Sequence, residues 1–144
     1  MTDDRVKQGT KDYWNRWDWE WFLSLELGKR KPAPVLKDFI ITLQKLDGIQ
    51  IATVGVLSHS PQDHIHLLAL GQSRKGLSLK DSNPVPWERY WAETVHKSAK
   101  IIRIPSFGDQ RRIVSYMVDR NMPRGYHETL QEYNLKLLKR SRAR

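Results

Sequence analysis

Residues 49–70 read IQIATVGVLSHSPQDHIHLLAL, two apolar runs on either side of a short polar turn. Ile and Val dominate the first run, residues 49–58, and β-branched residues of this kind are typical of strands. The turn, residues 60–63, contains Ser, Pro and Asp, which favour a reversal of the chain. Because the second run, residues 64–70, is long enough for another strand, the sequence predicts a β-hairpin.

Two histidines, His64 and His66, stand one residue apart in the second strand of this hairpin. Side chains two residues apart in a strand point to the same face, about 7 Å apart along the chain. If the turn comprises residues 60–63 alone, His59 lies directly opposite His64, and cross-strand partners share a face. Three imidazoles arranged in this way can bind a divalent ion and leave coordination positions open. A shift of one residue in register would turn His59 away.

Hydrophobic spacing predicts the elements that flank the hairpin. Between Trp17 and Leu27 large apolar residues alternate with more polar ones, and a period of two indicates a strand. Another strand is expected at residues 100–104, and Asp109 is expected to cap the helix that follows it. Apolar residues at helical spacing predict helices at residues 34–46, 86–97, 109–121 and 127–140.

The resulting order is strand, helix, strand, strand, helix, strand, helix, helix. It predicts an α+β fold in which helices flank a central antiparallel sheet. A length of 144 residues suits one domain with one hydrophobic core. We expect this domain at residues 13–140, with a flexible N-terminus at residues 1–12 and a basic C-terminal tail at residues 141–144.

The charge balance favours a polyanionic partner, because 25 Lys and Arg stand against 16 Asp and Glu, a net charge of +9. The chain has no cysteine, so a metal site must use His, Asp or Glu. No apolar run approaches the roughly 20 residues that span a membrane, and the N-terminus lacks the apolar core of a signal peptide. We therefore expect no membrane partner and a cytoplasmic location, with the nucleoid or a plasmid if the source is bacterial.

Three segments, taken in order, resemble the motifs of the HUH endonucleases. Residues 64–68, HIHLL, are similar to the histidine–hydrophobe–histidine motif that this family carries on a central strand. Residues 21–27, WFLSLEL, resemble its first motif. Residues 113–120, IVSYMVDR, resemble its third, in which a helical tyrosine is followed three residues later by a lysine. The resemblance covers most of the chain and is greatest to single-tyrosine initiators of rolling-circle replication in plasmids and single-stranded DNA viruses.

The resemblance implies a ferredoxin-like HUH fold and a metal-dependent endonuclease and strand transferase. Its substrate would be single-stranded DNA at an origin or hairpin, and unwinding would need a separate helicase. The expected ligands for Mn²⁺ or Mg²⁺ are His64, His66 and His59. Glu26, on the polar face of the first strand, and Asp119 are further candidate ligands.

The nucleophile that the resemblance implies is Tyr116, which would attack a phosphodiester and stay joined to the 5′ phosphate. Tyr126 is the rival nucleophile. Because a phenol is mostly protonated at neutral pH, nearby cations must help to ionise it. Arg112 and Arg120 lie four residues before and after Tyr116, near one face of the helix. Other candidates for phosphate binding are Arg111, Arg103 and Lys100.

The sequence departs from the family at Asp119, where the third motif has lysine. Arg120 could supply the cation, Asp119 could itself approach the metal, or the site could bind DNA without cutting it. Tyr116 could also be an ordinary core tyrosine, since apolar residues surround it in the sequence. The remaining alternatives are a transposase- or relaxase-type strand transferase and an unrelated basic α+β protein with a chance His-x-His.

Overall fold

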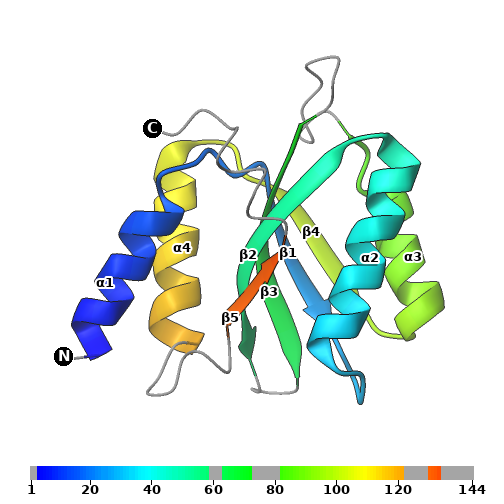
Figure 1. Cartoon of the computed structure of the whole chain (residues 1–144), viewed down its shortest axis with the longest axis horizontal. Coiled ribbons are helices and arrows are strands. Elements are labelled where there is room, and N and C mark those ends of the chain that lie inside the picture. The colour runs from blue at the N-terminus through cyan, green and yellow to red at the C-terminus, as the bar shows by residue number, and fades with distance from the viewer. Residues whose placement is uncertain (1–2, 59–62, 73–81, 122–129, 134–144) are drawn as a thin grey trace.

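The structure is a computed structural model that describes residues 3–58, 63–72, 82–121 and 130–133. The helices are α1 (Asp3–Trp14), α2 (Pro32–Asp47), α3 (Val85–Val95) and α4 (Phe107–Asn121), and the strands are β1 (Trp21–Glu26), β2 (Gln50–Ser58), β3 (His64–Gln72), β4 (Ala99–Arg103) and β5 (Leu130–Tyr133). The strands form one sheet in the order β4-β1-β3-β2-β5, and each neighbouring pair is antiparallel. The expected α+β fold with a central antiparallel sheet and flanking helices is therefore confirmed (Figure 1).

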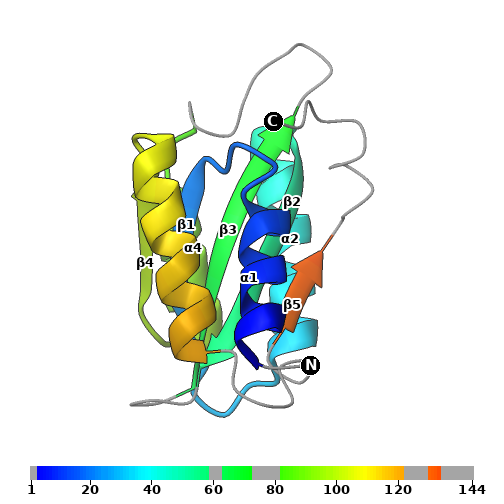
Figure 2. The same ribbon diagram turned by 90° about the vertical axis from the view of Figure 1, so that its left-hand side faces the viewer.

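Helices cover both faces of the sheet, with α2 and α3 on one side and α1 and α4 on the other (Figures 1 and 2). Each side has its own core. Phe39 of α2 and Trp91 of α3 pack with Leu67 of β3 on one face. Val114 of α4 packs with Leu68 of β3 on the other. Because β2 and β3 are buried on both faces, their sequences are almost continuously apolar.

The N-terminal segment is ordered, contrary to expectation. Residues 3–14 form α1, and Trp17 and Trp19 lie in the connection to β1 rather than in a strand. Both indoles are buried together with Trp14 in the core beneath α4, and Trp19 Nε1 donates to the carbonyl oxygen of Trp14 at 2.7 Å. The alternation that suggested a long strand therefore reflects a connection whose tryptophans turn into the core.

Two expectations about the C-terminal half are also wrong. Residues 130–133 form a strand that pairs with β2, where a helix over residues 127–140 had been predicted. Pairing with β5 satisfies backbone groups that would otherwise leave β2 as an open edge. The cap of α4 is Ser106, whose Oγ accepts from the Asp109 amide at 3.1 Å and donates to the Asp109 carboxylate at 2.7 Å. The N-cap of α4 is thus Ser106 and not Asp109, whose carboxylate orients the Ser106 hydroxyl.

Candidate functional site

Neighbouring strands bring four polar residues to one face of the sheet. β1 and β3 pair so that Ser24 lies opposite His66 and Glu26 lies opposite His64. Cross-strand partners share a face. The ring of His66 contacts that of Tyr116 on α4, so this is the face that α1 and α4 cover. The two histidines thus share a strand and a face, as their spacing predicted.

The two imidazoles converge on one another. Nε2 of His64 lies 2.8 Å from Nε2 of His66, and the rings are nearly perpendicular, at 89°. The other ring nitrogen of His66, Nδ1, lies 3.0 Å from Ser24 Oγ. If His66 donates its Nδ1–H to Ser24, its Nε2 carries a lone pair directed at His64. Ser24 then fixes both the tautomer and the orientation of the ring.

His66 is deeply enclosed for a histidine. Its side chain is 8% exposed, and the ring of Phe22 stacks on it at 5.6 Å between centroids. Burial, and to a smaller degree the neighbouring His64, lowers the pKa of His66 to about 4. The imidazole is therefore neutral at pH 7, which is the form that binds a metal ion.

Tyr116 stands beside this histidine pair on α4. Neighbouring Val114 and Met117 are buried, whereas Tyr116 is 50% exposed. Its ring lies edge-on to that of His66, with 5.9 Å between centroids, and Cζ of Arg120 lies 5.7 Å from the Tyr116 ring centroid. The alternative of a core tyrosine is therefore wrong, because the phenol is open to solvent and flanked by a histidine and a cation.

The donor set suits a divalent ion, although it is incomplete within the described residues. An ion bound by both Nε2 atoms would replace the hydrogen bond between them, and Ser24 would act as the outer partner of His66. In the part of the chain that the structure describes, no group of three or more His, Asp or Glu side chains converges. Glu26 is placed opposite His64 on the same face, so it remains the candidate for an additional ligand.

The observed hairpin register changes the expected place of His59. His64 pairs with Ser58, so residues 59–63 form a connection of five residues rather than a turn of four. The predicted pairing of His59 with His64 is therefore wrong by one residue. His59 and the rival nucleophile Tyr126 lie outside the described residues, as does the basic C-terminal tail.

Of the strand cations, one is near the site and one is not. Lys100 of β4 lies opposite Ser24, in the cross-strand row that also holds His66. Arg103 lies instead over the ring of Trp21, at 5.4 Å from the centroid. Since Trp21 belongs to the core beneath α2 and α3, Arg103 is not part of the histidine site.

The remaining arginine candidates lie on α4. Arg111 and Arg112 are exposed, and Arg112 forms an ion pair with Asp109. The pKa of Asp109 is lowered by its hydrogen bond with Ser106 and then by Arg112. Arg120 is thus the α4 arginine that the structure places against Tyr116.

Asp119 is engaged away from the histidines. Its Oδ1 lies 2.8 Å from Nζ of Lys11, which links α4 to α1. Lys11 was not among the predicted site residues, because residues 1–12 were expected to be flexible. The bond between Ser24 and His66 was not predicted either, although strand alternation placed Ser24 on the polar face with Glu26.

Comparison with known proteins identifies no relative. No family model matches the chain, and no curated protein or solved structure is detectably similar to it. Within the described ranges no helix combines the length and apolar character needed to cross a membrane. Function therefore rests on the geometry of the site.

Proposed function

We propose that the chain is a metal-dependent, HUH-type nuclease that nicks and rejoins single-stranded DNA with Tyr116 as its nucleophile. One observation carries this proposal: a half-exposed phenol stands beside the converging imidazoles of His64 and His66. A candidate nucleophile and candidate metal ligands, supplied by a helix and a strand, thus meet at one point. A tyrosine beside a bound metal ion is a combination that can cleave a phosphodiester.

The arrangement of the elements supports the proposal. β1, α2, β2, β3, α3 and β4 follow one another in the split βαβ succession, and their strands are ordered β4-β1-β3-β2. This is the ferredoxin-like arrangement that the resemblance to HUH endonucleases implies. The histidines lie on the central strand β3 and the tyrosine lies on the helix after β4, which is the order of the family motifs.

In the proposed reaction the phenol oxygen of Tyr116 bonds to a backbone phosphorus and the bond from that phosphorus to O3′ breaks. The 5′ phosphate remains esterified to the tyrosine, and the phenolic proton ends on the departing 3′ hydroxyl. Attack by a 3′ hydroxyl on this ester reverses the step and joins the strands. Arg120, beside the Tyr116 ring, would pair with the phosphate under attack. His64 and His66 would hold Mn²⁺ or Mg²⁺, whose charge would stabilise the non-bridging oxygens.

The sheet surface beside the histidines suits a single strand. Phe22 and Ile102 are cross-strand partners on the face of His66, and Ile102 is 44% exposed. Lys100 lies on the same face, two residues before Ile102. An exposed apolar side chain against which a base can pack, next to a cation that pairs with phosphate, suits single-stranded DNA.

Among such enzymes we favour an initiator of rolling-circle replication, because the nick leaves a 3′ hydroxyl that a polymerase can extend, and a separate helicase would open the duplex. A second candidate is an HUH-fold protein that binds DNA without cutting it. The ion pair of Asp119 with Lys11 favours this candidate, since it occupies the position where the family carries a lysine.

The two candidates differ in whether a covalent adduct forms. Protein is incubated with Mn²⁺ and an end-labelled pool of random-sequence single-stranded DNA, and adducts are resolved in SDS. We expect a metal-dependent adduct that disappears in Tyr116→Phe and persists in Tyr126→Phe. Tyr13→Phe, at an exposed tyrosine of α1, is the matched control and should retain it. Retention of DNA with no adduct in the wild type would support the binding protein, and an adduct in Tyr116→Phe would refute our nucleophile.

A further inference from the structure

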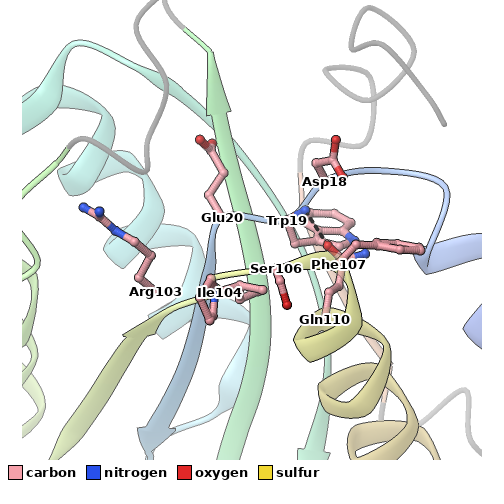
Figure 3. A pocket seen from close by; sticks show the side chains of 9 residues that line it. Asp18, Trp19, Glu20, Arg103, Ile104, Ser106, Phe107 and Gln110 are labelled. Atoms are coloured by element: carbon pink, nitrogen blue, oxygen red, sulfur yellow. Dashed lines mark hydrogen bonds between the residues drawn. The ribbon is translucent and has the colours of Figure 1, made fainter.

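A second feature lies at the opposite end of β1 from the histidines. Here residues 18–20, which lead into β1, and residues 103–107, which link β4 to α4, line a cavity of about 370 Å³ that is partly open to solvent (Figure 3). This volume is within the range of sites that take small molecules or single groups of a larger ligand. Its lining includes Asp18, Trp19, Glu20, Arg103, Phe107 and Gln110.

Hydrogen bonds between separate segments fix the walls of this cavity. The side chain of Gln110 is 1% exposed, and its Oε1 accepts from the Trp19 amide at 2.9 Å while its Nε2 donates to the Trp17 carbonyl oxygen at 2.9 Å. Glu20 Oε1 accepts from the amide of Gly71 at 2.8 Å. The cavity is therefore built by bonds that join α4, the 15–20 connection and β3.

The lining favours a base over a phosphate. Two carboxylates, Asp18 and Glu20, project in the same direction, away from α4 (Figure 3). Although the chain has a net charge of +9, these two acids would repel a phosphate in this cavity. Phe107, which is partly exposed, adds flat apolar surface, which suits an unstacked base.

Guanine matches this lining better than the other bases. Its Watson–Crick edge carries adjacent N–H donors, which one carboxylate can accept together, and its O6 and N7 accept from an arginine such as Arg103. Thymine presents carbonyl oxygens on both sides of its single N–H, and these would face the carboxylates of Asp18 and Glu20. We therefore expect the cavity to favour the base that presents the most N–H donors to its carboxylates.

The distances along β1 and along α4 both place this cavity close to the histidine site. Four residues of extended chain separate Glu20 from Ser24, which lies opposite His66, and they span about 13 Å. Nine residues of helix separate Phe107 from Tyr116, and they also span about 13 Å. A stacked strand advances about 3.4 Å per nucleotide, so this separation is no more than about four nucleotides.

We propose that this cavity holds one guanine base of the substrate strand, within about four nucleotides of the phosphate that Tyr116 attacks, and so selects where the strand is cut. This inference rests on the proposed function, because it takes single-stranded DNA as the ligand. It adds a base-reading site to a surface that otherwise contacts phosphates and base faces.

The test measures binding with the Tyr116→Phe protein, so that no cleavage is needed. The probes are twelve-nucleotide oligo(dT) and the same oligonucleotide with one central dG, dA or dC, compared by fluorescence anisotropy. We expect the dG probe to bind about ten-fold more tightly than oligo(dT), the discrimination typical of a good bidentate pair. Asp18→Asn and Glu20→Gln should remove this preference without weakening the binding of oligo(dT), because thymine is the base that the two carboxylates disfavour. Asp38→Asn, at an exposed acid of α2, is the matched control and should preserve it.

Equal affinity for all four probes, an equal gain with dA or dC, or a dG preference that survives both substitutions would overturn the proposal. The covalent adduct of the wild-type protein with the random pool is scored separately. An adduct without a guanine preference contradicts only the base site, whereas a guanine preference without an adduct contradicts only the nuclease.

Discussion

His66 is both a buried residue of the sheet and a proposed metal ligand. It is enclosed by Phe22 and Tyr116, its Nδ1 is held by Ser24, and its Nε2 meets that of His64. Each contact favours the neutral imidazole in one orientation. A metal ligand and a buried histidine both need a neutral imidazole, so His66 can serve as both.

The lowered pKa of His66 predicts that the folded protein loses stability in acid. The unfolded chain takes up a proton near pH 6.5, whereas the native imidazole resists protonation until about pH 4. Stability from this residue is therefore complete above about pH 6.5 and is lost as the pH falls from 6.5 to 4, by about 3 kcal/mol in total. Urea unfolding in buffer with a chelator, at a series of pH values, measures this loss.

Carboxylates also titrate in part of this pH range, so the comparison with a variant isolates the histidine. His66→Gln should be less stable at pH 7, yet its free energy of unfolding should fall less steeply between pH 6.5 and pH 4. Parallel pH dependences for the two proteins would show that His66 is not the group responsible.

Among the elements, β2 and β3 approach one another unusually closely at Gly55. A Cβ atom added at this residue would lie 2.1 Å from the backbone oxygen of His66 and 2.6 Å from Leu67 Cδ2. The backbone oxygen cannot move without disturbing the strand that carries the histidines. The absence of a side chain at Gly55 is therefore a condition for the position of His66.

Gly55→Ala should therefore destabilise the protein by at least the roughly 1–3 kcal/mol typical of overpacking. It should also disturb the histidine pair, which is visible as a shift of the imidazole NMR signals. Gly9→Ala in α1 is the matched control, because no atom lies within 4 Å of the added methyl group. It should stabilise α1 by about 0.5–1 kcal/mol, so equal effects at the two glycines would contradict this view of the β2–β3 contact.

The helix pair α1 and α4 offers a second prediction at this scale. The ion pair between Lys11 and Asp119 is partly exposed, so we expect it to contribute at most about 1 kcal/mol. Lys11→Glu should lower the free energy of unfolding by that order, and Lys11→Glu combined with Asp119→Lys should restore it. A double-mutant cycle in urea measures the coupling, and a coupling energy of zero would remove Lys11 from the account of α4.

The elements that the sequence predicted well are those with a clear hydrophobic pattern. α2 buries one face at helical spacing and β3 is an almost continuous apolar run next to a polar turn, so their approximate positions could be inferred. The shared face of the two histidines follows from the two-residue period of a strand. α1 could not, because its residues are mostly polar and Trp14 is buried only by contact with other segments. β5 is a strand because β2 offers it a partner, and the hairpin register depends on one extra residue in the connection. These are tertiary effects that local spacing does not contain.

On the scale of the whole molecule, the two faces of the sheet are arranged for different tasks. The face beneath α2 and α3 is closed by a large aromatic core. The other face carries the histidines, Tyr116 and the exposed pair Lys100 and Ile102 beside α4. If DNA binds as proposed, only cations near this second face should pair with its phosphates, although the net charge of +9 belongs to the whole chain.

Salt dependence tests this division, because each phosphate neutralised on a single strand contributes about 0.7 to the slope of log affinity against log salt concentration. We expect Lys100→Ala to reduce that slope by about 0.7 for oligo(dT) binding to the Tyr116→Phe protein. Lys37→Ala, at an exposed lysine of α2 on the other side of the sheet, removes the same charge and should leave the slope unchanged. An equal reduction in both variants would mean that the strand responds to net charge alone, and that the surface beside His66 does not bind it.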